Sequence, residues 1–178
     1  TDGGTATEQM PSGPITVGHI IPVGHPLETP IKNGAKYMLD VLRDEGGLLG
    51  QELEYTTADS KLSAQGAQQA SRRLVQQEEV DFLLVPLSSE WTLAVQQTVG
   101  GNDDIIYMDG SAGTPKLNQR VAQSPEEYGH WFTNVPRSPQ VFRAGGSNYE
   151  NHVAPAAGSH AVVVAEDLEW NANAAAQI

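Results

Sequence analysis

The sequence contains no cysteine, and only 6% of its 178 residues are aromatic. Without cysteine the chain cannot form disulfides, thiolate metal sites or thiol nucleophiles. No apolar run approaches the roughly 20 residues that are needed to span a bilayer. The length is nevertheless sufficient for one domain with a sizeable buried core.

Basic residues are also scarce, with 10 Lys and Arg against 22 Asp and Glu, so the net charge is −12. This charge argues against nucleic acid and anionic membrane surfaces as partners, because both require clustered basic residues. Acidic residues are dispersed along the chain and only four lysines accompany them. This composition favours adaptation to high salt, where screening reduces self-repulsion; an ordinary acidic protein is the alternative.

Strand-like and helix-like segments alternate after a polar N-terminal stretch. Residues 1–14 lack apolar periodicity and predict a flexible leader, which is either a tether or a bare terminus. Strands are expected at 15–22, 52–58, 80–85 and 105–108, and helices at 26–45, at 89–99 and from a cap at Asp59 or Ser60 onward. Gly46 and Gly47 are expected to end the first helix.

The order βαβαβαβ predicts an α/β fold, with a parallel sheet and helices on both of its faces. The third and fourth strands are almost continuously apolar, which is typical of strands that are covered on both faces. A helix is expected from Ser124, with Trp131 and Phe132 behind it. Residues 141–143 are expected to form a short strand that leads to a crossing at Gly145 and Gly146.

The predicted organisation is therefore a lobe at 15–143 and the beginning of a second α/β lobe at 144–178. A strand at 160–165 and a helix at 167–178 are expected within this second lobe.

Ligands bind open parallel sheets beyond the carboxyl ends of the strands. Three loops are expected there, at 22–26, 86–89 and 109–114. Small polar residues in these loops could bind a carboxylate or a zwitterion, although a helix cap at Ser88 or Ser89 and a plain turn after Asp109 are equally compatible with the sequence. The candidate ligand-binding residues are His25, Ser88, Ser89, Ser111, Ala112, Gly113 and Thr114.

Other chemistry finds little support. The sequence has neither glycine-rich nucleotide motif, no paired histidine spacing for a metal and no G-x-S-x-G nucleophile elbow. We therefore expect no catalytic residue, no metal and no cofactor. An enzyme on a flavodoxin-like or Rossmann-like sheet stays a lesser alternative.

Several motifs together resemble type I periplasmic binding proteins of ABC importers, and most of all their leucine/isoleucine/valine-binding group. They are EGGLLG at 45–50 with Asp59, the serine pair 88–89, and DGSAGTPKL at 109–117. The segment HAVVVAEDLEW at 160–170 is similar to the first strand and loop of that family's second lobe. The likeness runs from Ile15 to the end of the sequence.

The resemblance implies two α/β lobes that close over a ligand about a hinge. It implies that Ser89 holds a ligand carboxylate and that Ser111, Ala112 and Gly113 contact the carboxylate and ammonium. Gly113 stands where relatives have threonine, with Thr114 next to it, and residues 23–27 depart from the family pattern. Because members are considerably longer, the first lobe is expected to be incomplete and to lack its return segments.

The function that this implies is an extracytoplasmic solute-binding protein without catalytic activity. It would deliver an amino acid or similar small carboxylate to the permease of an ABC importer. Its contact with the membrane would be a lipid anchor before residue 1. A ligand-sensing domain of a receptor or regulator with the same fold is the alternative.

Overall fold

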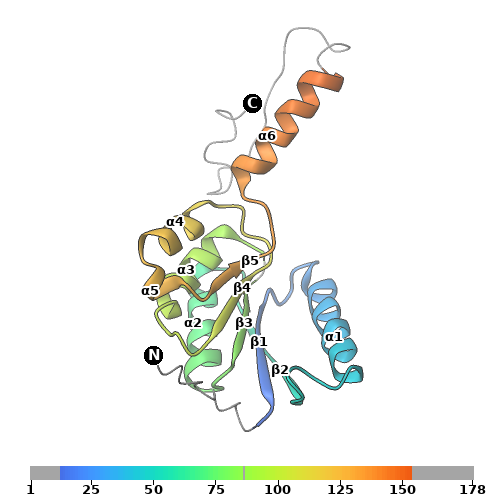
Figure 1. The fold of residues 1–178 in the computed structure, drawn as a ribbon, viewed down its shortest axis with the longest axis vertical. Coiled ribbons are helices and arrows are strands. Elements are labelled where there is room, and N and C mark those ends of the chain that lie inside the picture. The colour runs from blue at the N-terminus through green and yellow to red at the C-terminus, as the bar shows by residue number, and fades with distance from the viewer. Residues whose placement is uncertain (1–12, 86, 154–178) are drawn as a thin grey trace, which may run out of the picture.

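The computed structural model describes residues 13–85 and 87–153, which form a five-stranded parallel sheet in the order β2-β1-β3-β4-β5 (Figure 1). The strands are β1 (Ile15–Ile21), β2 (Leu53–Asp59), β3 (Phe82–Val85), β4 (Ile106–Asp109) and β5 (Trp131–Thr133). The helices are α1 (Glu28–Asp44), α2 (Ala64–Gln76), α3 (Ser89–Val99), α4 (Lys116–Gln123), α5 (Pro125–Tyr128), α6 (Ser138–Asn148) and the π-helix η1 (Tyr149–Val153). The predicted α/β class is confirmed.

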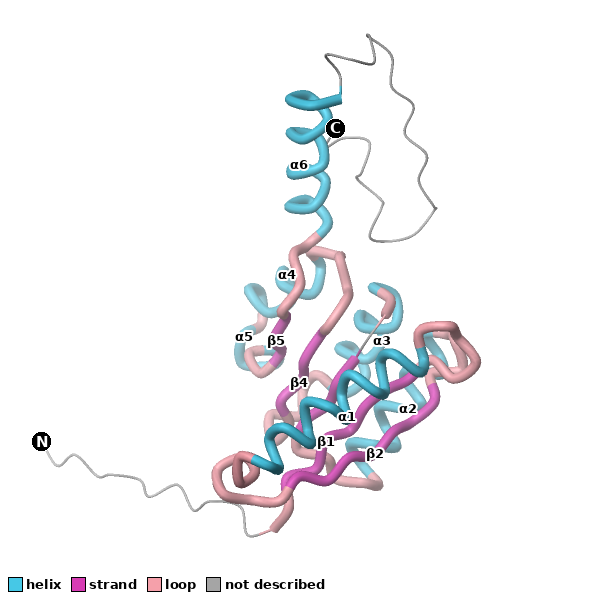
Figure 2. The backbone as a smooth tube through the Cα atoms, turned by 90° about the vertical axis from the view of Figure 1, so that its right-hand side faces the viewer, coloured by secondary structure: helices cyan, strands magenta, loops and turns pink. Residues whose placement is uncertain are grey.

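Helices lie on both faces of the sheet, with α1 on one side and α2 and α3 on the other (Figure 2). The larger core fills the α2 and α3 side, where Leu74, Leu83 and Val95 are fully buried. A smaller core forms on the opposite side, where Leu39 of α1 packs with Val17 and other residues of β1 and β2. The sheet is therefore buried most thoroughly on its α2 and α3 side.

The helix boundaries follow local chemistry. The N-cap of α2 is Ser63, not Asp59 or Ser60 as expected, because the Ser63 hydroxyl accepts a 3.0 Å bond from the Gly66 amide. The end of α1 is as predicted. Gly47 follows it at φ +83°, and a Cβ there would lie 1.9 Å from the Gln51 carbonyl oxygen, so only glycine fits.

Residues 141–143 lie within α6, so the strand predicted there is wrong; Gly145 and Gly146 belong to the same helix, and a crossing to a second lobe near them stays a prediction. The start of α6 explains the difference: the Arg137 amide donates to Gln140 Oε1 at 2.7 Å, and Pro139 lies in the first turn, where proline is favoured. These signals outweigh the strand preference of a Val-Phe pair.

The helix predicted from Ser124 is the short α5, which ends at Tyr128 before Gly129, and Trp131 and Phe132 after it form β5. The Trp131 ring stacks on Tyr107 of β4, with ring centroids 4.7 Å apart. This stacking joins the short edge strand to the core.

The α1 face of the sheet is only partly covered. Ile106 and Met108 of β4 and Phe132 of β5 are 38%, 36% and 51% exposed. The expectation that β4 is covered on both faces is therefore wrong for the described residues, because α1 lies over β1 and β2.

The predicted leader, apart from its last residues, and the strand and helix predicted at 160–178 lie outside the described residues. Within the described part of the chain, no helix is both long and apolar enough to cross a membrane.

Candidate functional site

Two of the three predicted loops are hydrogen-bonded to each other at the carboxyl edge of the sheet. The Thr114 amide donates to the Ser89 hydroxyl at 3.2 Å, and the Leu87 amide donates to the Ser111 hydroxyl. Leu87 has φ +89°, a left-handed conformation that is unusual for a bulky residue. The loops after β3 and β4 thus form one surface, as the position of these strands predicts.

The six predicted residues of these loops differ in accessibility. Ser89 is 3% exposed, and both Ala112 and Thr114 are fully buried. Ser111 is exposed, while Ser88 and Gly113 are half-buried. The accessible part of the surface is therefore made by Ser88, Ser111 and Gly113, with the other three behind it.

Ser88 is the N-cap of α3, which was one of the two interpretations of the serine pair. The Ser88 hydroxyl accepts from the Glu90 amide at 3.2 Å and donates to Glu90 Oε2 at 2.5 Å. Ser89 is the first residue of the helix, and its hydroxyl, which accepts from the Thr114 amide, donates to no acceptor among the described residues.

The amides of residues 111–114 reveal a single open donor. Ser111 and Ala112 donate to Asp109 Oδ1 at 3.1 and 2.8 Å, and Thr114 donates to Ser89. Among the described residues, the Gly113 amide has no such partner, and Gly113 is partly accessible. An amide without a hydrogen-bond partner, in a residue that is partly accessible, is suited to an anionic oxygen.

His25, the candidate of the first loop, is held within its own turn. Its Nδ1 accepts from the Leu27 amide at 3.1 Å, and its carbonyl accepts from Glu28. Within residues 13–85 and 87–153, no hydrogen bond joins His25 to the other two loops.

Asp109, the last residue of β4, organises the loop that follows it. It is 1% exposed. Besides the two loop amides on Oδ1, its Oδ2 accepts from Thr133 Oγ1 at 3.2 Å and from Arg137 Nη1 at 2.6 Å. This carboxylate was not predicted as a site residue, although an acidic residue before Gly-Ser is a common signal for side-chain bonds to the next amides.

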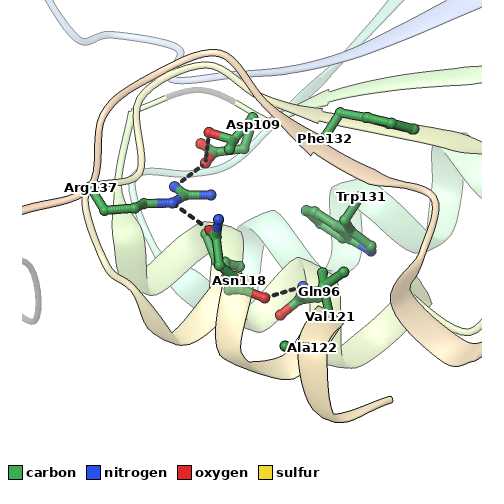
Figure 3. A pocket seen from close by; sticks show the side chains of 10 residues that line it. Gln96, Asp109, Asn118, Val121, Ala122, Trp131, Phe132 and Arg137 are labelled. Carbon is green, nitrogen blue, oxygen red and sulfur yellow. Dashed lines mark hydrogen bonds and ion pairs between the residues drawn. The ribbon is translucent and has the colours of Figure 1, made fainter. Parts of the chain in front are cut away.

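Arg137 is the other residue that the sequence did not reveal. It is 8% exposed, and its Nε donates to Asn118 Oδ1 at 2.6 Å (Figure 3). A cavity of about 190 Å³ lies beside the pair, and its wall includes Leu117 and Trp131. No local motif could have identified Arg137, because Asp109 is 28 positions away in the chain.

The strongest shifts in pKa belong to strand residues rather than to residues of the predicted loops. Burial lowers the pKa of His19 to about 4 and raises that of Tyr55 to about 12; His19 Nδ1 and the Tyr55 hydroxyl are 2.8 Å apart. Burial also raises the pKa of Tyr107.

No cluster of three or more metal-binding side chains occurs in the described part of the chain. The loop surface itself presents hydroxyl groups and a backbone amide, which can form hydrogen bonds with a ligand.

Comparisons with known proteins place the chain in a family and give its fold. Residues 14–178 match the family described as periplasmic binding protein. No curated protein matches the chain in sequence.

Solved structures share the fold. The branched-chain amino acid substrate-binding protein LivJ of Streptococcus pneumoniae, in complex with isoleucine, has a TM-score of 0.64 at 21% identity, over 79% of this chain and 38% of that one. The leucine-binding protein LivK of Thermotoga maritima has a TM-score of 0.64 at 14% identity, over 78% and 37%. A solute-binding protein of an ABC transporter from Rhodopseudomonas palustris, in complex with 3,4-dihydroxy benzoic acid, has a TM-score of 0.59 at 13% identity, over 78% and 37%. The chain thus spans less than two-fifths of the length of these proteins.

Proposed function

Because this chain belongs to the periplasmic binding protein family, we propose that it is part of an extracytoplasmic solute-binding protein that delivers an amino acid or a similar small carboxylate to the permease of an ABC importer. Members of this family bind solutes and typically catalyse no reaction. The described residues supply one surface of the site, and a second lobe would close over the ligand about a hinge.

The observation that carries this proposal is the open Gly113 amide beside the serine pair. A ligand carboxylate at this position would accept from the Gly113 amide and from the Ser89 hydroxyl, whose proton is available. The N-terminus of α3 adds favourable partial positive charge at the same edge. Ser88, Ser111, Ala112 and Thr114 would shape the surroundings of these two donors, and His25 would contact the ligand from the first loop.

The ligands of the similar structures support a carboxylate-centred site. Isoleucine and 3,4-dihydroxy benzoic acid share a carboxylate and differ in the rest of the molecule. We propose a branched-chain amino acid as the first ligand to test. A lipid anchor before residue 1 and adaptation to a salty compartment are further parts of this proposal.

A thermal-shift screen of the full-length protein tests it. Ligands that bind only the native state raise the melting temperature. We expect L-leucine, L-isoleucine or L-valine to raise it, and L-leucinamide, which lacks the carboxylate, to raise it much less. An equal shift with L-leucine and L-leucinamide would contradict a carboxylate-centred site. No shift with any amino acid or small carboxylate in the screen would contradict solute binding.

A further inference from the structure

Arg137 lies between β5 and α6, where the chain leaves the sheet (Figure 1), and its side chain points toward Asp109 and Asn118 (Figure 3). Its Nη1 donates to Asp109 Oδ2 at 2.6 Å and also to the Ala112 carbonyl oxygen. Its Nε is occupied by Asn118 Oδ1 at 2.6 Å. One guanidinium thus holds the strand end, the loop and α4 together.

The residue after Arg137 strengthens this connection. The Ser138 amide donates to the Gly113 carbonyl oxygen at 2.6 Å, and Ser138 is 6% exposed. The first residues of α6 are therefore attached to the 111–114 loop by a side chain and by the backbone. Movement of one without the other would break both attachments.

Net stabilisation alone does not explain why the Asp109–Arg137 ion pair is buried. Asp109 and Arg137 are 1% and 8% exposed, and removing two ions from water costs roughly as much as their attraction returns. What the pair does supply is a single geometry. The two Asp109 oxygens accept four hydrogen bonds, two from loop amides, one from Thr133 and one from Arg137.

We propose that Arg137 is a positioning residue of the binding site, an inference that rests on the proposed function. It holds Asp109 and the Ala112 carbonyl, and thereby keeps the 111–114 loop in the conformation that leaves the Gly113 amide open. The same contacts join that loop to the first turn of α6. A ligand bound at the loop therefore favours one placement of this turn, and displacement of the turn lowers the affinity for the ligand.

Hydrogen exchange in the full-length protein tests the positioning role without any ligand. Arg137→Met removes the donors to Asp109 and Ala112, and we expect residues 110–114 to exchange at least tenfold faster, with α2 and α3 unchanged. Arg143→Met is the matched control, because Arg143 is exposed and donates to the Pro139 carbonyl within α6. If Arg137→Met does not fold, Arg137→Lys keeps the charge but cannot reach all three partners, and we expect the same local change at smaller size.

Calorimetry with L-leucine supplies the second measurement. We expect Arg137→Met to weaken leucine binding at least tenfold and Arg143→Met to leave it unchanged. Loop exchange that is unaltered, or that rises equally throughout α2 and α3, would overturn the positioning role. A failure of the unaltered protein to bind leucine would count against the proposed ligand alone, and the exchange measurement would still decide the role of Arg137.

Discussion

The Thr114 amide donates a 3.2 Å hydrogen bond to the hydroxyl oxygen of Ser89, and both residues are buried. This bond joins the loop after β4 to the start of α3. It also orients the Ser89 hydroxyl, since the oxygen is occupied by Thr114 and the proton is left to point elsewhere. Ser89 therefore has a structural task in addition to its proposed contact with a ligand.

Replacing Ser89 with Ala should weaken binding of L-leucine to the full-length protein by about 1–3 kcal/mol, because the carboxylate loses a donor and the Thr114 amide loses its acceptor. Titration calorimetry measures the change. Ser71→Ala is the matched control: Ser71 is buried in α2, where its hydroxyl donates to the Gln68 carbonyl. Unchanged affinity in Ser89→Ala would remove Ser89 from the site.

Stability should fall in acid because of His19. Burial holds its folded-state pKa at about 4, below the ordinary 6.5, so between these pH values the unfolded chain binds a proton that the folded protein does not. The free energy of unfolding is therefore highest above pH 6.5 with respect to this group. It falls as the pH is lowered toward 4, by on the order of 3 kcal/mol in total.

Urea unfolding at several pH values between 7.5 and 4.5 measures this loss. His19→Gln should flatten the dependence on pH, whereas Tyr55→Phe, which removes only the hydroxyl beside His19, should retain it. An identical slope in His19→Gln and the unaltered protein would contradict the assignment to His19.

Gly47→Ala should destabilise the protein more than Gly46→Ala. Both glycines have positive φ, which costs about 1–2 kcal/mol for alanine. A Cβ at Gly47 also meets the Gln51 carbonyl, whereas a Cβ at Gly46 has no heavy atom within 4 Å among the described residues. Urea unfolding of the two variants provides the comparison, and equal losses would show that the turn adjusts freely.

Salt should stabilise the protein if the net charge of −12 opposes the compact state. The screening length falls from about 10 Å to about 3 Å between 0.1 and 1 M salt, so we expect the melting temperature to rise with KCl. Asp103→Asn with Asp104→Asn reduces the net charge to −10 and should reduce this rise. A melting temperature that stays constant or falls up to 2 M KCl would contradict the proposed adaptation.

The sequence predicted the alternating elements well because each carries its own local signal. The hydrophobic run of β3, the Gly pair after α1 and the serine pair at the start of α3 are signals that lie within a few residues of one another. Because β3 and β4 are parallel neighbours, the loops that follow them lie at the same edge of the sheet. This is why the contact between residues 111–114 and Ser89 could be anticipated without knowing any distance.

The misplaced parts depend on contacts that are distant in sequence. Trp131 forms a strand because it stacks on Tyr107, 24 positions earlier. Arg137 can be buried because its guanidinium forms an ion pair with the buried Asp109 carboxylate. Residues 141–143 show the opposite case, since a local capping bond at Arg137 outweighed their preference for a strand.

The open face of β4 and β5 has a practical consequence for handling this chain alone. Ile106, Met108 and Phe132 form an accessible apolar strip that ends at β5, the edge strand of the sheet in the described residues. Exposed apolar surface beside an edge strand favours pairing between copies. A preparation of these 178 residues by themselves should therefore self-associate as its concentration is raised, and charged substitutions along the strip are the place to begin improving its solubility.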